Sequence, residues 1–401
     1  MIPRHRPPFG SAALACTAVR SLFNNGGVEQ LERQYRQRLG VRHAVWLPSA
    51  RYGITRTIQF RIASDAEIIC SAFNCGAVHH AAVECQRAVR YADCSPGSLQ
   101  MDCSGTVSGG HGVILSEMFG HRFSSVDLNQ SLVRDAKLRI FDMAMAIPTP
   151  ADMRRMQRSD VTVLSFGLGK SLYAGWGGMA LTQCGDMSAM LLRCRDQDLA
   201  SARRMGRLAW NANVVLRTVA HEPVLYRQLR ARQQRRMSEA TDCSSLFTVN
   251  SHEWHRPSTR LHVTQALQNL EQSTAFSERR MTLSDEYRKH LRGCSDCMQL
   301  PPNDLSALSH FCIRVPGQRR EAIRQHLWSH GIDAGTLFPF PQQTCCVEEF
   351  PQASQAAAEV LNLPLSTQLD RRTIRGICDA LRVAMDLKVT DGIVTRRSAA
   401  A

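Results

Sequence analysis

The residues of this chain that could do chemistry are concentrated between Leu138 and Thr182. Two short apolar runs rich in β-branched residues predict buried strands here; the first ends at Asp142, and Lys170 follows the second in a glycine-rich turn. A carboxylate at the carboxyl end of a strand can reach a ligand over the sheet edge, and glycines leave room beside it for a lysine amine. Pyridoxal phosphate (PLP) requires these two groups: an amine for a Schiff base and an acid for the pyridinium nitrogen.

Lysine usage singles out one residue of this pair. The chain has four lysines and takes nearly all of its positive charge from arginine. Lys137 and Lys289 lie among charged neighbours in segments with a helical pattern, and Lys388 lies near the C-terminus. Only Lys170 follows an apolar strand in a glycine-rich turn. A cofactor-binding amine and an ordinary surface-loop lysine both remain open as interpretations of Lys170 from this setting alone.

Three motifs follow one another between residues 142 and 181. They are DMAM beginning at Asp142, SFGLGK ending at Lys170, and GGMAL beginning at Gly177. In order and spacing they resemble the DegT/StrS family of PLP-dependent sugar aminotransferases. The resemblance implies that Lys170 holds PLP as a Schiff base, that Asp142 pairs with the pyridinium nitrogen, and that Ser165 binds the cofactor phosphate.

A strand-to-helix turn at Ser49-Ala50-Arg51 matches the place where this family binds the cofactor phosphate. The physical expectation agrees, because the unpaired N–H groups and the dipole at a helix start favour a phosphate. Arg51 adds a positive charge to the turn.

At four further positions the sequence departs from the family pattern. Three of these positions carry expected cofactor contacts, and the fourth flanks the pocket. The departures are Cys75 for an aromatic residue that stacks on the pyridine ring, Glu117 for a histidine, Met145 for a glutamine or histidine at the cofactor, and Ser258 for an asparagine that reaches the phosphate in the neighbouring subunit.

Strand-like and helix-like segments alternate from residue 44 to residue 182, which predicts an α/β fold with a mostly parallel sheet and helices on both faces. The resemblance covers residues 25 to 388 and implies fold type I: a seven-stranded-type sheet in a large domain and a smaller α+β C-terminal domain. We expect an N-terminal arm over residues 1–24, the large PLP-binding domain over 25–250, the small domain over 251–388 and a tail over 389–401.

The composition of the chain restricts where the protein could be located and what it could bind. No apolar run reaches about 18 residues, so no membrane span is expected. The 15 cysteines are odd in number and scattered, which favours reduced thiols and a cytoplasmic location over a disulfide framework. Cys294 and Cys297 have zinc-type spacing but no second pair, so no metal is expected. The alanine-rich N-terminus, interrupted by prolines, does not predict secretion.

The net charge of +14 and the arginine-rich run over residues 227–236 raise nucleic acid as a partner. No recognised nucleic-acid-binding motif accompanies that run. A solvated arginine-rich helix face, or an anionic substrate such as a nucleotide diphosphate-sugar, explains the charge as well. Nucleic acid is therefore not expected as a partner.

The resemblance implies an aminotransferase that moves an amino group from glutamate or glutamine to a keto-sugar, itself nucleotide-linked, in a homodimer. Lysine rather than histidine at position 170 argues against the dehydratase branch of the family. Three alternatives stay open: a PLP enzyme of the same fold acting on a non-sugar ketone or carrying out dehydration and aromatisation, a non-enzymatic homologue, and a nucleic-acid-binding protein.

Overall fold

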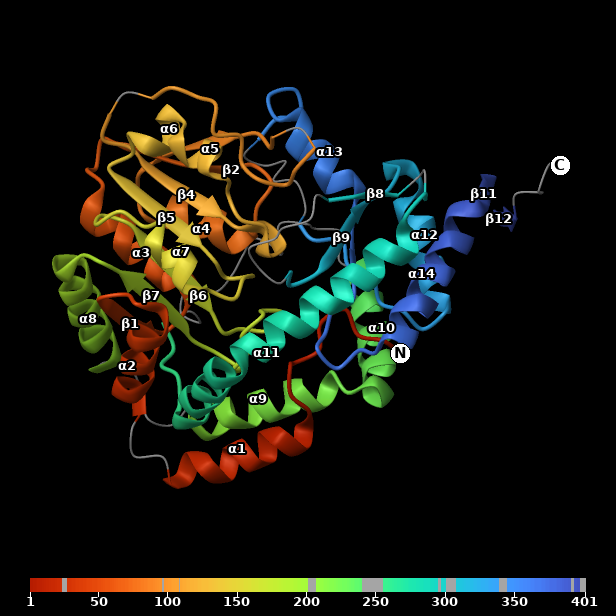
Figure 1. Cartoon of the computed structure of the whole chain (residues 1–401), viewed down its shortest axis with the longest axis horizontal. Coiled ribbons are helices and arrows are strands. Elements are labelled where there is room, and N and C mark those ends of the chain that lie inside the picture. Colours follow the sequence, from red (N-terminus) through yellow and green to blue (C-terminus); the bar gives the residue numbers. More distant parts are fainter. Residues whose placement is uncertain are drawn as a thin grey trace.

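The computed structural model describes residues 1–23, 27–95, 97–107, 109–200, 207–239, 255–294, 297–300, 308–338, 345–390 and 393–396. A seven-stranded sheet forms the centre of its larger part, with the strand order β1-β7-β6-β5-β4-β2-β3 (Figure 1). The strands are His43–Leu47 (β1), Glu67–Ser71 (β2), Ala88–Ala92 (β3), Gly112–Ser116 (β4), Leu138–Asp142 (β5), Val161–Ser165 (β6) and Gly178–Thr182 (β7).

The sheet is mostly parallel, as the alternation of strands and helices predicted. Strands β2 to β6 pair with one another only in the parallel sense, whereas β7 runs antiparallel to both β6 and β1. All residues of β4, β5 and β7 are buried, as expected for strands covered on both faces. The carboxyl ends of β2, β4, β5 and β6 therefore lie together at one edge, where α/β folds bind ligands.

Helices cover both faces of the sheet. One face packs on Ala50–Arg61 (α3), Gly76–Glu84 (α4) and Gly185–Ala200 (α8), and the other on Gly27–Leu39 (α2), Ser131–Arg134 (α6), Pro150–Arg154 (α7) and the start of Arg260–Leu291 (α11). Further helices of this part are Ser11–Phe23 (α1), Met118–Gly120 (η1), Ser125–Asn129 (α5), Arg207–Ala220 (α9) and Pro223–Glu239 (α10).

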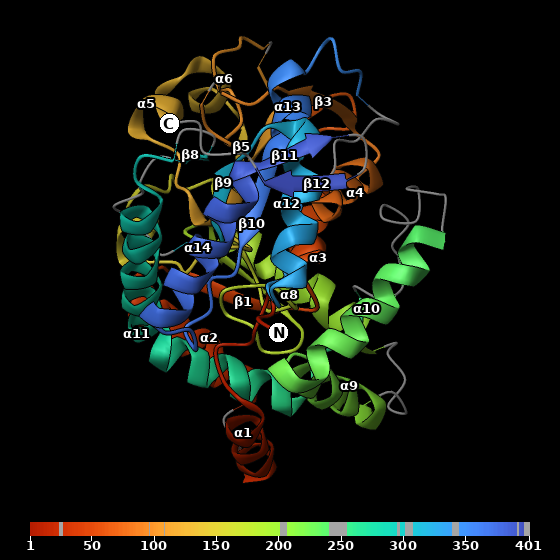
Figure 2. The ribbon, with the colours of Figure 1, turned by 90° about the vertical axis from the view of Figure 1, so that its right-hand side faces the viewer.

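A smaller α+β part contains an antiparallel sheet of three strands in the order β10-β9-β8 (Figure 2). Helix α11 contributes Leu270 to the core under the large sheet and Tyr287 to the core of the smaller part. The elements of this part are Met298–Gln299 (β8), Phe311–Arg314 (β9), Gly317–Ser329 (α12), Pro351–Glu359 (α13), Val360–Leu363 (β10) and Arg371–Asp386 (α14).

The N-terminal end of the chain lies against the smaller part. Ile2 pairs with Ile332, and Arg4 makes a bidentate ion pair with buried Asp333 at 2.7 and 2.9 Å. A hairpin of Leu387–Thr390 (β11) and Ile393–Arg396 (β12) begins just before the stretch predicted as a tail from residue 389 and continues into it. The predicted boundary between residues 250 and 251 lies outside the described residues. None of the described helices is long and apolar enough to cross a membrane.

Candidate active site

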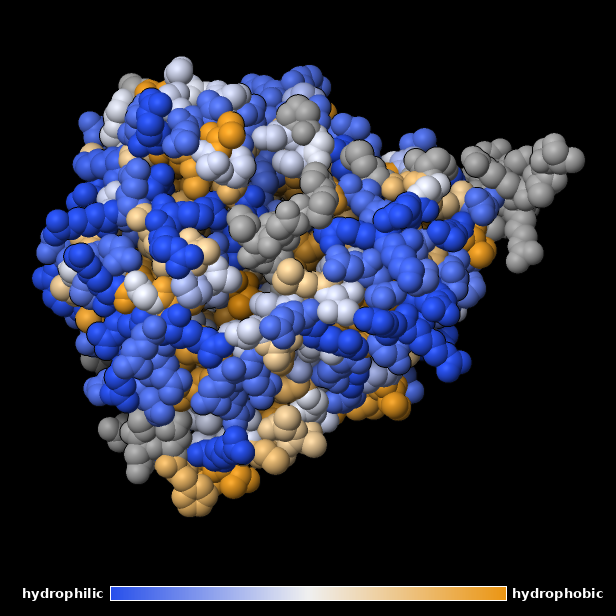
Figure 3. Space-filling model, in the orientation of Figure 1, coloured by the Kyte–Doolittle hydropathy of each residue, from blue (hydrophilic) through white to orange (hydrophobic). Residues whose placement is uncertain are grey.

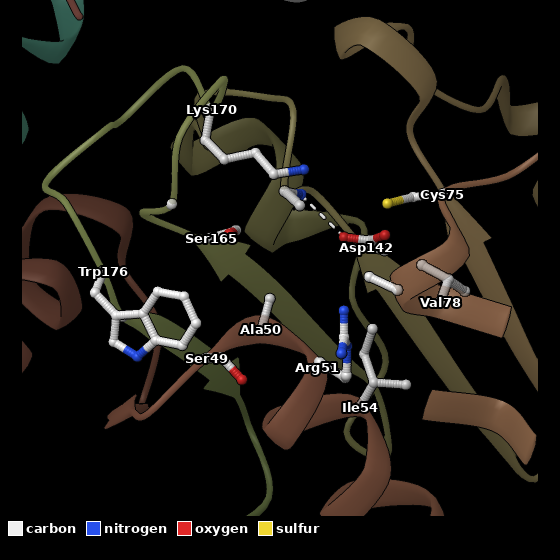
Figure 4. Close-up of a pocket in the computed structure, with 14 residues that line it drawn as sticks. Ser49, Ala50, Arg51, Ile54, Cys75, Val78, Asp142, Ser165, Lys170 and Trp176 are labelled. Atoms are coloured by element: carbon white, nitrogen blue, oxygen red, sulfur yellow. Dashed lines mark hydrogen bonds between the residues drawn. The ribbon is translucent and has the colours of Figure 1, made fainter. Parts of the chain in front are cut away.

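A pocket of about 260 Å³ opens at the carboxyl ends of β5 and β6, beside the start of α3 (Figure 4). It collects most of the residues that the sequence placed at a cofactor. The lining residues are Ser49, Ala50, Arg51, Ile54, Cys75, Ala77, Val78, Asp142, Ala144, Ser165, Gly167, Lys170, Trp176 and Gly177.

Asp142 is the last residue of β5, and its side chain is buried. The backbone N–H of Ala144 donates to Asp142 Oδ1 at 3.0 Å, and the hydroxyl of Ser116 donates to Oδ2 at 3.4 Å. Burial raises the pKa of Asp142, while the nearby Lys170 amine and the two donors act in the opposite direction. A cation placed against this carboxylate would favour its ionised form.

Lys170 lies in the turn after β6, and Figure 4 shows its amine and the Asp142 carboxylate pointing into the same pocket. The turn closes with a hydrogen bond from the Lys170 N–H to the Gly167 carbonyl at 3.3 Å. Gly169 has a φ of +79°, in the left-handed region that favours glycine. The glycine-rich sequence around Lys170 is therefore required by the backbone that presents the amine.

The start of α3 forms the opposite end of the pocket. Ser49 is the N-cap, and its hydroxyl accepts from the Tyr52 N–H at 3.1 Å. Gly178 crosses this turn so closely that a Cβ there would lie 2.4 Å from the backbone carbon of Ser49. Burial lowers the pKa of the Arg51 guanidinium in the pocket wall, so an anion bound beside it would stabilise its charged form.

These residues fit the parts of PLP. The first N–H groups of a 12-residue helix and the Ser165 hydroxyl suit a phosphate, Asp142 suits a ring nitrogen, and Lys170 suits an aldehyde. Cys75, the N-cap of α4, points its sulfur into the same pocket (Figure 4).

Two predicted cofactor contacts lie outside the pocket lining. Met145 is buried in a cluster with Phe73 and Phe119, and Ser258 accepts a hydrogen bond from the Trp46 indole N–H. The separation of Met145 from the pocket reflects the turn after β5, where Ala144 rather than Met145 lines the pocket.

Glu117 does not line the pocket either. Its carboxylate lies 2.7 Å from Arg122, which also makes a bidentate pair with Asp152. All three side chains are buried. Two carboxylates thus share one guanidinium, and burial raises the pKa of Glu117 to about 7.

Sequence reasoning missed three residues at this site. Trp176 lines the pocket from within the third motif, but a loop residue gives no periodic signal. Asn74 and Ser116 support Asp142 from the ends of two other strands, where the sequence showed only apolar runs ending in polar residues.

Residues 13–219 and 258–382 match the model of the DegT/DnrJ/EryC1/StrS aminotransferase family. The chain belongs to this family. One relative, dTDP-3-amino-3,4,6-trideoxy-alpha-D-glucose transaminase of Streptomyces venezuelae, is 29% identical to this chain over 145 residues. That match spans 33% of this chain and 38% of the relative's length.

Solved structures share the DegT-family fold over nearly the whole chain. DesV from S. venezuelae is 17% identical with a TM-score of 0.69, and the match covers 97% of this chain and 100% of DesV. CalS13 from Micromonospora echinospora is 17% identical, with a TM-score of 0.68 and coverage of 95% and 99%. The PLP form of Spr1654 from Streptococcus pneumoniae is 16% identical, with a TM-score of 0.68 and coverage of 96% and 99%. At these identities the likeness establishes the fold.

No group of three or more His, Cys, Asp or Glu side chains suited to a metal ion occurs in the part of the chain that the structure describes. Cys294 and Cys297 are both present as free thiols there.

Proposed function

We propose that this DegT-family chain is a PLP-dependent aminotransferase that transfers an amino group to the keto group of a nucleotide-linked sugar. The observation that carries the proposal is the convergence of Asp142, Lys170 and the α3 N-terminus on one pocket. Support comes from the family, from the relative named as a dTDP-sugar transaminase, and from the PLP form of Spr1654.

Each side chain has a definite task in this proposal. When bound, PLP supplies an electron sink for the charge left at the substrate carbon that loses a proton. Lys170 would hold the cofactor through Nζ and would carry that proton. Asp142 would keep the ring nitrogen protonated, and the N–H groups at the start of α3, with Ser49 and Ser165, would hold the phosphate.

The substrates are proposed from charge and resemblance. Glutamate or glutamine is the amino donor, because the family resemblance implies it. A nucleotide diphosphate on the acceptor suits the net charge of +14 and the guanidinium of Arg51 at the pocket wall. A cytoplasmic location follows as part of the same proposal.

A second candidate function rests on Cys75 in the pocket wall. A thiol has no π-face to stack on a pyridine ring, and Met145 lies outside the pocket. These two differences favour a PLP enzyme of the same fold that acts on a non-sugar ketone.

We also propose a homodimer, with the exposed face of α1 in its interface. Val19, Leu22 and Phe23 on this helix expose 58%, 71% and 77% of their surface. Figure 3 shows hydrophobic surface gathered at the lower edge of the molecule, where α1 lies in Figure 1. A second copy of this chain would remove these side chains from water.

An absorbance experiment tests the proposed function. The wild-type protein, mixed with PLP, should develop the band of lysine-bound cofactor, and glutamate or glutamine should bleach it. Lys170→Ala should lack the band, whereas Lys137→Ala, which changes an exposed lysine, should keep it.

Three results would decide between the candidates. Return of the band with a nucleotide-linked keto-sugar supports the first candidate. Return only with other ketones supports the second. A wild-type protein without the band, or one that amino donors never bleach, contradicts an aminotransferase.

A further inference from the structure

A second, smaller cavity of about 20 Å³ shares Lys170 with the active-site pocket. Its walls come from the N-terminal residues 4–7, from the turn that carries Lys170, and from residues at the middle of α11 and before β9. A space of this size accommodates one particle about as large as a water molecule. The cavity is therefore too small for a phosphate or an amino acid.

The described walls of this cavity carry positive charge and no carboxylate. Arg4, Arg6, Lys170 and Arg280 all line it, and no Asp or Glu in the described part of the chain does. Carboxylates that do not line the cavity neutralise two of these cations: Arg4 pairs with Asp333 at 2.7 Å, and Arg6 pairs with Glu222 at 2.7 Å. Lys170 lies close enough to Asp142 to lower the pKa of that carboxyl.

Arg280 differs from the other three cations. Only 4% of its surface is exposed, and no carboxylate pairs with it in the described part of the chain. Its Nη1 donates to the Ser171 hydroxyl at 2.8 Å and to the Leu308 carbonyl at 3.4 Å. Its Nε has no acceptor among the described residues.

The Arg280 guanidinium keeps its charge at neutral pH. Burial lowers the pKa of Arg280 to about 10, which leaves the group protonated at pH 7. A buried cation without a counter-charge is costly, and proteins ordinarily pair it. Among the described residues, hydrogen-bond acceptors reach one nitrogen of this group, and no carboxylate pairs with it.

Two neutral histidines complete the cavity. His310 Nε2 lies 2.7 Å from His5 Nδ1, and His310 Nδ1 lies 2.9 Å from the Ser309 hydroxyl. Burial lowers the pKa of His5 to about 3 and that of His310 well below its usual range. Both rings are therefore uncharged at pH 7, and neither offsets Arg280.

We propose that this cavity binds one monatomic anion, chloride under ordinary conditions, held by the guanidinium of Arg280. The anion supplies the negative charge that the cavity walls lack, and its size matches the space. It also joins the N-terminal residues 4–7 to α11 and to the turn of Lys170. The proposal concerns the protein without cofactor and does not depend on the proposed enzyme activity.

Crystals of the wild-type protein grown in sodium bromide test the site directly. We expect an anomalous peak in the cavity between Arg280 and the turn that carries Lys170. A cavity that holds only water in those crystals overturns the proposal. Because this measurement uses the wild-type chain, it remains decisive even where a variant does not fold.

Thermal unfolding tests the same site in solution. At constant ionic strength, replacing gluconate by chloride or bromide should raise the Tm of the wild-type protein saturably, by about 2 °C or more. Arg280→Met should lose this rise, and Arg288→Met, which changes a partly exposed arginine on the same helix, should keep it. An equal Tm in gluconate and chloride, or a rise that Arg280→Met retains, overturns the proposal.

Discussion

Ser116 donates a hydrogen bond to Asp142, from the end of β4 to the end of β5, with 3.4 Å between Oγ and Oδ2. Asn74 sets the direction of this bond, because its Nδ2 donates to Ser116 Oγ at 2.8 Å. The hydroxyl hydrogen of Ser116 is then left for the carboxylate. Ser116 thereby favours the ionised form of Asp142 and opposes the effect of burial.

Ser116→Ala should weaken PLP binding by about tenfold, because a hydrogen bond to a charged group is lost. The pKa of Asp142 should rise further, which moves the acid limb of the pH–rate profile to higher pH. An absorbance titration with PLP at several pH values measures both effects. Ser273→Ala, which removes another buried hydroxyl, is the control. Identical titrations for the two variants would contradict the role of Ser116.

Asp142→Asn should raise the Tm of the cofactor-free protein at pH 7 while lowering kcat by about 10²–10⁴-fold. The pKa of Asp142 is raised by burial from its ordinary 3.8, so its stabilising contribution is present below pH 3.8 and is lost as the pH rises through the folded-state pKa. The gain in Tm should therefore shrink as the pH falls toward 3.8. Thermal melts without PLP across this pH range measure the difference in Tm between the two proteins. A lower Tm for the variant at pH 7 would contradict a carboxylate that is destabilised by burial.

Glu117→Gln should flatten the pH dependence of stability. The pKa of Glu117 rises from 4.5 to about 7, so its contribution is full below pH 4.5 and is lost as the pH passes 7, by about 3 kcal/mol. Urea unfolding at a series of pH values measures the free energy of unfolding. The wild-type curve should fall more steeply than the variant curve over this interval. Parallel curves would mean that Glu117 is ionised throughout.

Cys75 should be protected from alkylation by PLP. Its sulfur lies in the pocket wall, so a bound cofactor would block access to it. Cys346 is exposed and serves as the internal control. Peptide mass spectrometry after brief iodoacetamide treatment, with and without PLP, measures both thiols. Protection of neither, or of both equally, would place the cofactor elsewhere.

Leu22→Asp combined with Phe23→Asp should convert a dimer to a monomer. Both side chains are largely exposed on α1, and charges there would oppose burial against a second copy. Light scattering coupled to size-exclusion chromatography measures the mass. Val126→Asp, on the exposed side of α5, is the matched control. A wild-type chain that elutes as a monomer contradicts the homodimer.

The strands could be predicted from sequence because their signal is local. The run from Gly112 to Ser116 is apolar up to its last residue, and the structure buries all of it. The run that ends at Asp142 is also buried throughout, although it contains Arg139, so the pairing of a strand end with a later lysine could be inferred from the sequence alone. The mostly parallel character of the sheet followed from the alternation of strands and helices.

Side-chain direction beyond a strand end was not predictable in the same way. The turn after β5 places Met145 in a buried cluster with Phe119, outside the pocket lining. The support of Asp142 by Asn74 and Ser116 joins segments 42 and 26 residues apart. No periodicity in the sequence reports contacts of that kind, because they depend on which strands become neighbours in the sheet.

The ion pair between Arg4 and Asp333 has a consequence for how the chain folds during its synthesis on the ribosome. The seven strands of the large sheet have all been synthesised by Thr182, and that sheet can assemble early. Arg4 cannot form its ion pair until Asp333, 329 residues later in the sequence, has been synthesised. A nascent chain that has not reached Asp333 therefore carries the whole large sheet while Arg4 still lacks this partner. The N-terminal residues can reach these contacts only after synthesis has passed Asp333.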